Sequence, residues 1–125
     1  MRPDVKEMRE KLTSLLMDHQ GLLEVAEDSP EKFEVQGTVP TMQGKKQVDG
    51  IYFASVVPKP KDVRLYFFPI YTHAADFKGQ LPQALRKSLK GKSCFHLKKI
   101  DEEQEQNLRQ LITRGVELYK KDGLL

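Results

Sequence analysis

Two strongly apolar runs follow each other almost directly, and they constrain the fold of this chain more than any other feature. The first run covers 47–57 and the second covers 62–71, and the proline-rich segment 58–62 between them predicts a turn. Because so short a link cannot form the crossover of a parallel pair, the runs predict neighbouring antiparallel strands. Both are apolar at nearly every position, which is typical of central strands covered on more than one side. Pro69 predicts either a break in the second ladder or its edge-facing end.

Shorter strand signals lie on both sides of this pair. Apolar and polar residues alternate at 23–25 and at 33–35, and the turn residues at 28–30 between them predict a hairpin. Alternation returns at 93–99, which predicts one more strand. The two faces of that strand carry Phe95 with Leu97 and Cys94 with His96.

Helical periodicity marks both ends of the chain. Residues 3–19 carry an apolar stripe, and Pro3 suits the first turn of a helix. Asp101 is a capping residue for a long helix to about Lys121, and a short helix is expected over 81–90. The expected inward stripe of the long helix is Leu108, Leu111, Ile112, Gly115, Val116 and Tyr119.

These elements together predict an α+β fold in a single domain over residues 1–125. About five strands form a mostly antiparallel sheet, and the N-terminal and C-terminal helices pack on it in one layer, as a two-layer sandwich. With 125 residues, of which 38% are hydrophobic, the chain can build a modest core. Since the central strands are apolar on both faces, the second face needs the short helix, a pocket or a homodimer contact to cover it.

Several classes of protein are excluded or disfavoured by composition. No apolar run approaches the ~20 residues of a membrane span. The first residues are not followed by an apolar segment, so we do not expect a secretory signal. The single cysteine, Cys94, cannot form an internal disulfide, which suits a reducing compartment. We therefore expect a cytoplasmic protein without a membrane partner.

Charge is distributed unevenly along the chain. The net charge is only +3, but residues 41–100 carry 12 basic and 3 acidic side chains, and residues 77–100 carry seven basic side chains and no acid. Such a stretch can steer an anionic partner. The candidate anion-binding residues are Lys87, Lys90, Gly91, Lys92 and Ser93. Because acidic helices can fold back over this stretch and cancel its field, we do not expect nucleic acid to be a partner.

The stretch from Leu81 to Gly123, with the segment YFFPIYTH before it, resembles the small bacterial YdhG-like family. The shared features are the segment Leu-Lys-Gly-Lys-Ser-Cys-Phe, an alternating strand that ends in Lys-Lys, and a terminal amphipathic helix. The resemblance covers roughly Phe33 to Gly123 and implies a compact, frataxin-like α/β sandwich. Some members are described as frataxin-like iron chaperones, so it also implies a non-enzymatic accessory protein that delivers iron to iron–sulfur assembly proteins.

Acidic side chains are the candidate iron ligands, because hard oxygen atoms suit iron ions. They lie on the first helix and around the first hairpin, and the candidates are Glu7, Glu10, Glu27 and Glu31. Lysines and an arginine interleave with the helix acids, so ordinary solvated surface is the alternative.

Two further groups carry weaker signals. Cys94 and His96, two residues apart on one strand face, are a candidate reactive pair, against the alternative of a packed thiol beside a surface imidazole. The aromatic side chains that can stack bases are Tyr52, Phe53, Tyr66, Phe67, Phe68 and Tyr71, for which we expect core packing instead. No zinc-site spacing, phosphate-binding loop or nucleophile motif occurs, so no catalytic residue is predicted. Three functions stay open in this order: an accessory protein with iron as cargo, an anion or nucleic-acid binding module that uses 77–100, and an enzyme.

Overall fold

The structure is a computed structural model, and it describes residues 3–125. The helices are α1 (Pro3–Met17), α2 (Pro69–Thr72), α3 (Ala74–Phe77), α4 (Gln83–Ser88) and α5 (Glu102–Lys121). The strands are β1 (Leu23–Asp28), β2 (Phe33–Gly37), β3 (Thr41–Gln43), β4 (Lys46–Val48), β5 (Tyr52–Pro58), β6 (Val63–Phe67), β7 (Leu89–Lys90) and β8 (Cys94–Leu97). No helix within this part of the chain is both long and apolar enough to cross a membrane.

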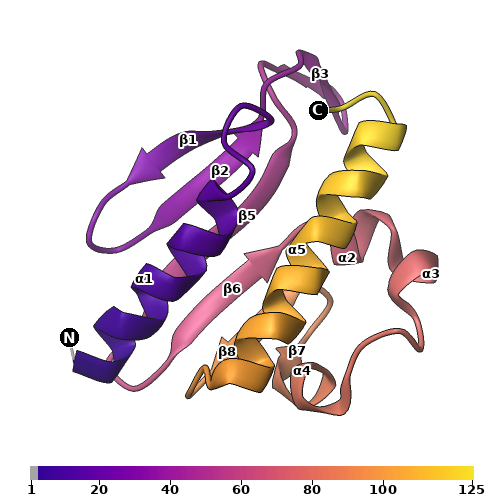
Figure 1. Ribbon diagram of the computed structural model, residues 1–125. Coiled ribbons are helices and arrows are strands. Elements are labelled where there is room, and N and C mark those ends of the chain that lie inside the picture. Colours follow the sequence, from indigo (N-terminus) through magenta and orange to yellow (C-terminus); the bar gives the residue numbers. More distant parts are fainter. Residues whose placement is uncertain (1–2) are drawn as a thin grey trace.

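Six of these strands form one antiparallel sheet in the order β1-β2-β5-β6-β8-β7. The other two, β3 and β4, pair only with each other and form a hairpin that projects beyond the sheet (Figure 1). The predicted α+β fold with an antiparallel sheet is confirmed, and the main sheet has six strands where about five were expected. The two apolar runs supply β5 and β6, which lie at its centre.

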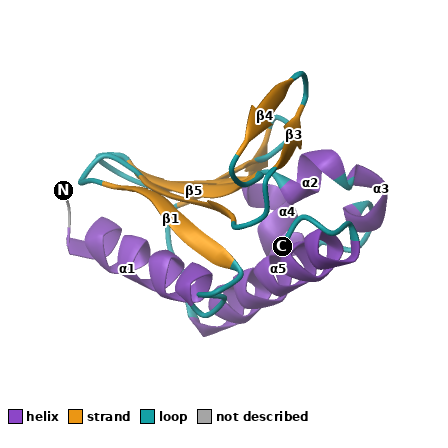
Figure 2. Cartoon of the chain, turned by 90° about the horizontal axis from the view of Figure 1, so that it is seen from above, coloured by secondary structure: helices purple, strands orange, loops and turns teal. Residues whose placement is uncertain are grey.

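Helices α1 and α5 lie on the same face of the sheet, as predicted (Figure 2). The opposite face of the central strands carries no helix within the described residues, and the β3–β4 hairpin rises on that side. The short helix α4 packs on α5 and β8 instead. Within residues 3–125 both long helices cover the same face, so the short helix does not cover the second face of β5 and β6, and a pocket or a homodimer contact there stays a prediction.

The hydrophobic core fills the space between the helices and the sheet. Phe53 lies at its centre, with its ring edge-on to Phe67 at 5.4 Å and to Tyr119 of α5 at 5.7 Å between centroids. All six residues of the predicted α5 stripe are buried. Asp101 caps this helix by accepting a hydrogen bond from the backbone N–H of Gln104 at 2.8 Å, as its position predicts.

The run 47–57 is not one strand. The β4 strand ends at Val48 and β5 begins at Tyr52, and Gly50 lies between them against the backbone of Gly37. A Cβ atom at position 50 would overlap the Gly37 carbonyl, so the two glycines allow a backbone contact that turns the chain out of the sheet.

The second run also ends early. The β6 strand stops at Phe67 and Pro69 opens α2, so the break predicted at Pro69 is confirmed, and the apolar run beyond it to Tyr71 is not strand. Proline has no N–H for the ladder and suits the first turn of a helix, which accounts for the break. The helix predicted over 81–90 is also shorter than expected, because Leu89 and Lys90 form β7.

Candidate functional site

Side chains of the sheet that point away from α1 and α5 form what we call the open face. They alternate with core residues, and the strand register aligns them in rows across the sheet. One row contains Ser55, Tyr66, Cys94 and Lys90 on consecutive strands, and Arg64 lies opposite His96 in the next row. The open face consists of Glu34, Gln36, Tyr52, Ser55, Val57, Arg64, Tyr66, Lys90, Cys94 and His96.

The open face is divided by charge. On the β2 side, Glu34 and the neighbouring Glu27 of β1 both pair with Lys32, at 3.1 and 3.5 Å. On the β6–β8–β7 side, the ionisable side chains of the described strands are Arg64, Lys90, Cys94, His96 and Tyr66, without a carboxylate. We call this second part the basic half.

A cleft of about 750 Å³ adjoins the basic half at the β7 edge of the sheet. We call it the lysine cleft, because Lys87 of α4, Lys90 of β7, and Lys98 and Lys99 after β8 all line it. All four lysines are exposed. His96 and Lys90 belong both to this cleft and to the open face, so the two surfaces are continuous.

Three carboxylates also line the lysine cleft, those of Asp62, Asp101 and Glu103. Asp62 lies 3.6 Å from the guanidinium of Arg64. Asp101 accepts the capping hydrogen bond at the positive end of α5 and lies 3.8 Å from the Lys99 ammonium. Two of the three carboxylates therefore face positive groups, which reduces their effect on the field of the remaining lysines.

The structure brings together only part of the predicted anion site. Lys87 and Lys90 line the lysine cleft, and they are joined there by Lys98 and Lys99. Lys92 lies elsewhere, with its ammonium 5.7 Å from the centre of the Tyr71 ring. Gly91 and Ser93 form the turn between β7 and β8, where the positive φ of 66° suits glycine. The sequence did not predict β7, and this hairpin is what separates Lys92 from the cleft.

Aromatic side chains form a second feature beside the basic half. Phe68 follows β6 and stacks on Tyr71, with 5.9 Å between ring centres and 21° between planes, and its other neighbour is Tyr52 at 5.5 Å. Tyr71 is 52% exposed. Core packing, the expectation for all six aromatic residues, holds for Phe53 and Phe67 and is wrong for Tyr71, because residue 71 lies on α2 beyond the end of the strand.

Cys94 and His96 share a face of β8 as predicted, opposite Tyr66 and Arg64 of β6. Burial raises the pKa of the Cys94 thiol, and the opposing effects of a Tyr66 hydrogen bond and the Arg64 charge are smaller. A thiol with a raised pKa holds its proton at neutral pH, which disfavours a reactive thiolate.

The candidate iron ligands lie on different elements. Glu7 and Glu10 are exposed on α1, Glu27 is on β1 and Glu31 is in the following turn. Glu7 lies 3.5 Å from Lys11. Within residues 3–125 no group of three or more His, Cys, Asp or Glu side chains is placed to hold a metal ion. The implied iron cargo stays a prediction, which titration of the protein with ferrous iron tests.

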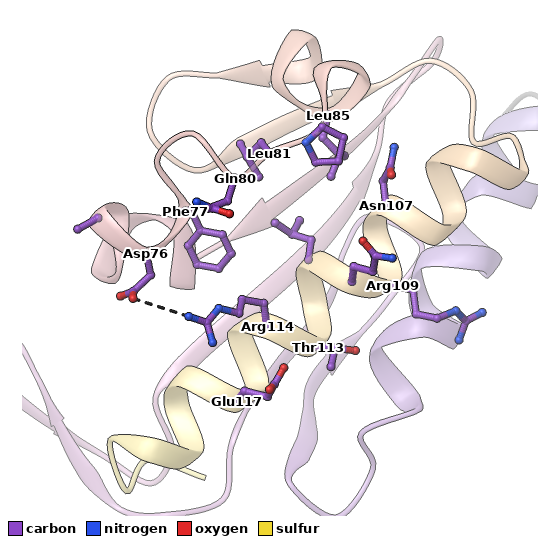
Figure 3. Close-up of a pocket in the computed structure, with 14 residues that line it drawn as sticks. Asp76, Phe77, Gln80, Leu81, Leu85, Asn107, Arg109, Thr113, Arg114 and Glu117 are labelled. Carbon is purple, nitrogen blue, oxygen red and sulfur yellow. Dashed lines mark ion pairs between the residues drawn. The ribbon is translucent and has the colours of Figure 1, made fainter.

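A groove of about 820 Å³ runs between α5 and the segment 75–85 (Figure 3). Phe77, Leu85 and Leu111 form its apolar floor. Arg114 at the rim lies 3.8 Å from Asp76, and Arg109 points away to Asp18, the residue after α1, at 3.0 Å. Sequence reasoning missed this groove, since its only signal was apolar residues outside the predicted strands. With both arginines facing carboxylates, it suits an anion less well than the lysine cleft.

Comparisons of the chain with protein-family models, curated proteins and solved structures find no match. Membership of the YdhG-like family stays a prediction.

Proposed function

We propose that this chain is a non-enzymatic binding module for a phosphate-bearing polyanion. The observation that carries the proposal is the convergence of four lysines from α4, β7 and the β8–α5 connection on one cleft. These residues come from the acid-free stretch 77–100, and the fold places them at one edge of the sheet.

Exposed lysines suit a polymer of phosphates better than a single phosphate. Each ammonium stays hydrated and contributes a modest attraction, so affinity grows with the number of phosphates neutralised and the counterions they release. Lysine is a point charge on a flexible stem and recognises backbone charge rather than shape. We therefore expect weak selectivity among phosphate polymers and a strong dependence on salt.

The positive surface extends beyond the cleft. Lys90 and His96 connect it to the basic half, where Arg64 lies next to Tyr66 along β6. Of the three carboxylates in the cleft, Asp62 and Asp101 have positive neighbours of their own, and Glu103 lies in the first turn of α5, at the positive end of the helix. An extended anion can therefore lie along the β7 edge of the sheet, because positive groups oppose the negative charges of Asp62 and Asp101.

A charge-reversal pair tests the proposal. Binding of a short inorganic polyphosphate is measured by calorimetry at low and at physiological salt, for the wild type and for Lys90→Glu with Lys98→Glu. The matched control is Lys6→Glu with Lys120→Glu, which changes the net charge equally on the helix side of the molecule. We expect binding at low salt that weakens steeply with salt, is lost in the cleft variant and is retained in the control. Absence of binding at low salt, or equal loss in both variants, would contradict the proposal.

A further inference from the structure

Resting on this proposed function, we propose that the polyanion is single-stranded nucleic acid, held by its phosphates in the lysine cleft and by its bases on two aromatic side chains. These are Tyr66 and Tyr71, and Phe68 supports the Tyr71 ring from one side; we call the three residues the aromatic strip. Phosphates supply the charge that the cleft recognises, and unpaired bases supply the flat rings that an aromatic side chain can stack on.

The cleft and the aromatic strip are close enough for one short strand to contact both. Lys90 lines the cleft and lies in the same row as Tyr66, with Cys94 between them. The row of Arg64 and His96 lies two residues along β6 and β8 from the row of Tyr66 and Cys94. Because a β-strand rises about 3.3 Å per residue, these two rows are about 7 Å apart. A nucleic-acid strand that leaves the cleft therefore reaches the aromatic rings within a few nucleotides.

Tyr71 is the best-placed stacking residue. It is 52% exposed, while one side of its ring is supported by Phe68, which in turn contacts Tyr52. The Lys92 ammonium lies over this ring, 5.7 Å from its centre, so a base that stacks on Tyr71 takes the place of this cation, which can then pair with the phosphate of that base. A supported, exposed ring with an adjacent lysine is the combination that single-strand binding proteins use.

Charge favours this occupant along one half of the sheet only. Glu34 and Glu27 lie on the β1–β2 side and share a single cation, Lys32, so this side keeps a net negative charge that disfavours phosphates. A bound strand is thereby confined to β6, β8 and β7, which carry Arg64, His96 and Lys90. An acidic peptide can also satisfy the lysines, but it does not use the aromatic strip. A duplex keeps its bases paired and stacked, and it likewise leaves the strip without a partner.

Four probes separate these occupants: labelled oligothymidylate of about 12 nucleotides, an abasic strand of the same length, a duplex and a poly-glutamate peptide. Fluorescence anisotropy measures each with the wild type and with Tyr71→Ala. The matched control is Met42→Ala, since Met42 is also an exposed apolar side chain but lies on the β3–β4 hairpin. We expect oligothymidylate to bind the wild type most tightly of the four probes. Tyr71→Ala should weaken the affinity for oligothymidylate about tenfold and leave the affinity for the abasic strand unchanged, and Met42→Ala should change neither affinity.

A second measurement uses the unaltered protein. The chain has four tyrosines and no tryptophan, so its emission comes from tyrosine. Stacked thymines should quench this emission and inorganic polyphosphate should not. Quenching by thymines alone supports the inference even if Tyr71→Ala does not fold.

The outcomes distinguish the two proposals. Equal affinity for normal and abasic strands, without quenching, overturns the stacking inference and leaves the polyanion function in place. Preference for duplex or for poly-glutamate also overturns it. If none of the phosphate probes binds at low salt, both proposals fail. The log of the affinity for oligothymidylate should fall with the log of salt at a slope of about −3 if four lysines each neutralise a phosphate.

Discussion

The imidazole Nε2 of His73 lies 2.6 Å from Oδ2 of Asp122, a residue 49 positions further along the chain. The other ring nitrogen, Nδ1, lies 3.1 Å from Asp76. A neutral imidazole donates from one nitrogen only, so both carboxylates receive a hydrogen bond only from the protonated ring. His73 thereby connects the start of α3 to the C-terminal end of α5.

Removal of this connection should destabilise the fold. We expect His73→Ala to lower the free energy of unfolding by about 1 kcal/mol, since the carboxylates are partly exposed and the bonds are screened by water. Urea denaturation measures the change. The control is His96→Ala on the open face, for which a change below about 0.5 kcal/mol is expected. Equal losses in the two variants would mean that the Asp122 contact contributes nothing specific.

Gly115 marks a close approach of α5 to the sheet. A Cβ atom at this position would lie 2.6 Å from Cζ of Phe67 and 3.1 Å from Cγ of Pro69. Alanine favours helix by about 1 kcal/mol over glycine, but overlap in a packed core costs about 1–3 kcal/mol. We expect Gly115→Ala to lower the thermal midpoint, whereas Gln110→Ala on the exposed side of α5 leaves it nearly unchanged. A higher midpoint for Gly115→Ala would contradict the close contact.

Stability should depend on pH through His19. Burial lowers the pKa of this imidazole below 6.5, and the neighbouring charge of Asp18 opposes the shift only in part. The unfolded chain therefore binds the proton more tightly, so the contribution of His19 is present above about pH 6.5 and is lost as the pH falls through the lower folded value. Urea unfolding at several pH values checks this, and His19→Gln should flatten the decline. Parallel curves for the variant and the wild type would exclude His19 as its source.

Cys94 should react slowly with thiol reagents. The raised pKa leaves little thiolate at neutral pH, and the side chain is only partly exposed. We expect a labelling rate below that of a free thiol in the unfolded chain, and Cys94→Ser should bind polyphosphate as the wild type does. Fast labelling of the folded protein would favour the alternative of a reactive Cys94–His96 pair.

The sequence predicted those parts of the fold that depend on local periodicity. The helical stripe that ends at Tyr119 and the alternation around Phe95 reflect which side of an element meets the core. The cap at Asp101 reflects the free backbone N–H groups of the first helical turn. The errors arose where the outcome depends on contacts distant in sequence. The β3–β4 hairpin depends on the meeting of Gly37 and Gly50, and the Asp49-Gly50 pair inside the run 47–57 is a local turn signal that the interpretation as one strand passed over.

The candidate site was predictable only in its charge. An acid-free run of lysines indicated a positive surface, but membership of the cleft depends on the β7–β8 pairing, which puts Lys90 opposite Cys94 at the cleft and leaves Lys92 in the turn, over the Tyr71 ring. Tyr71 was expected in the core because it was assigned to a central strand that covers the helix layer. Its exposure follows from the helix that Pro69 begins, and that helix reverses which side of the chain faces the solvent.

Both edges of the sheet are poor templates for another strand. Beyond Leu23, β1 is exposed, rich in carboxylates and interrupted by a register shift between Val25 and Glu27. At the other edge, β7 is only two residues long and follows α4 directly. Charged, irregular or very short edges discourage pairing with a second chain. These edges therefore disfavour the addition of a strand from a second chain, so a macromolecule that recognises the sheet is expected to contact its side chains and not the backbone of an edge strand.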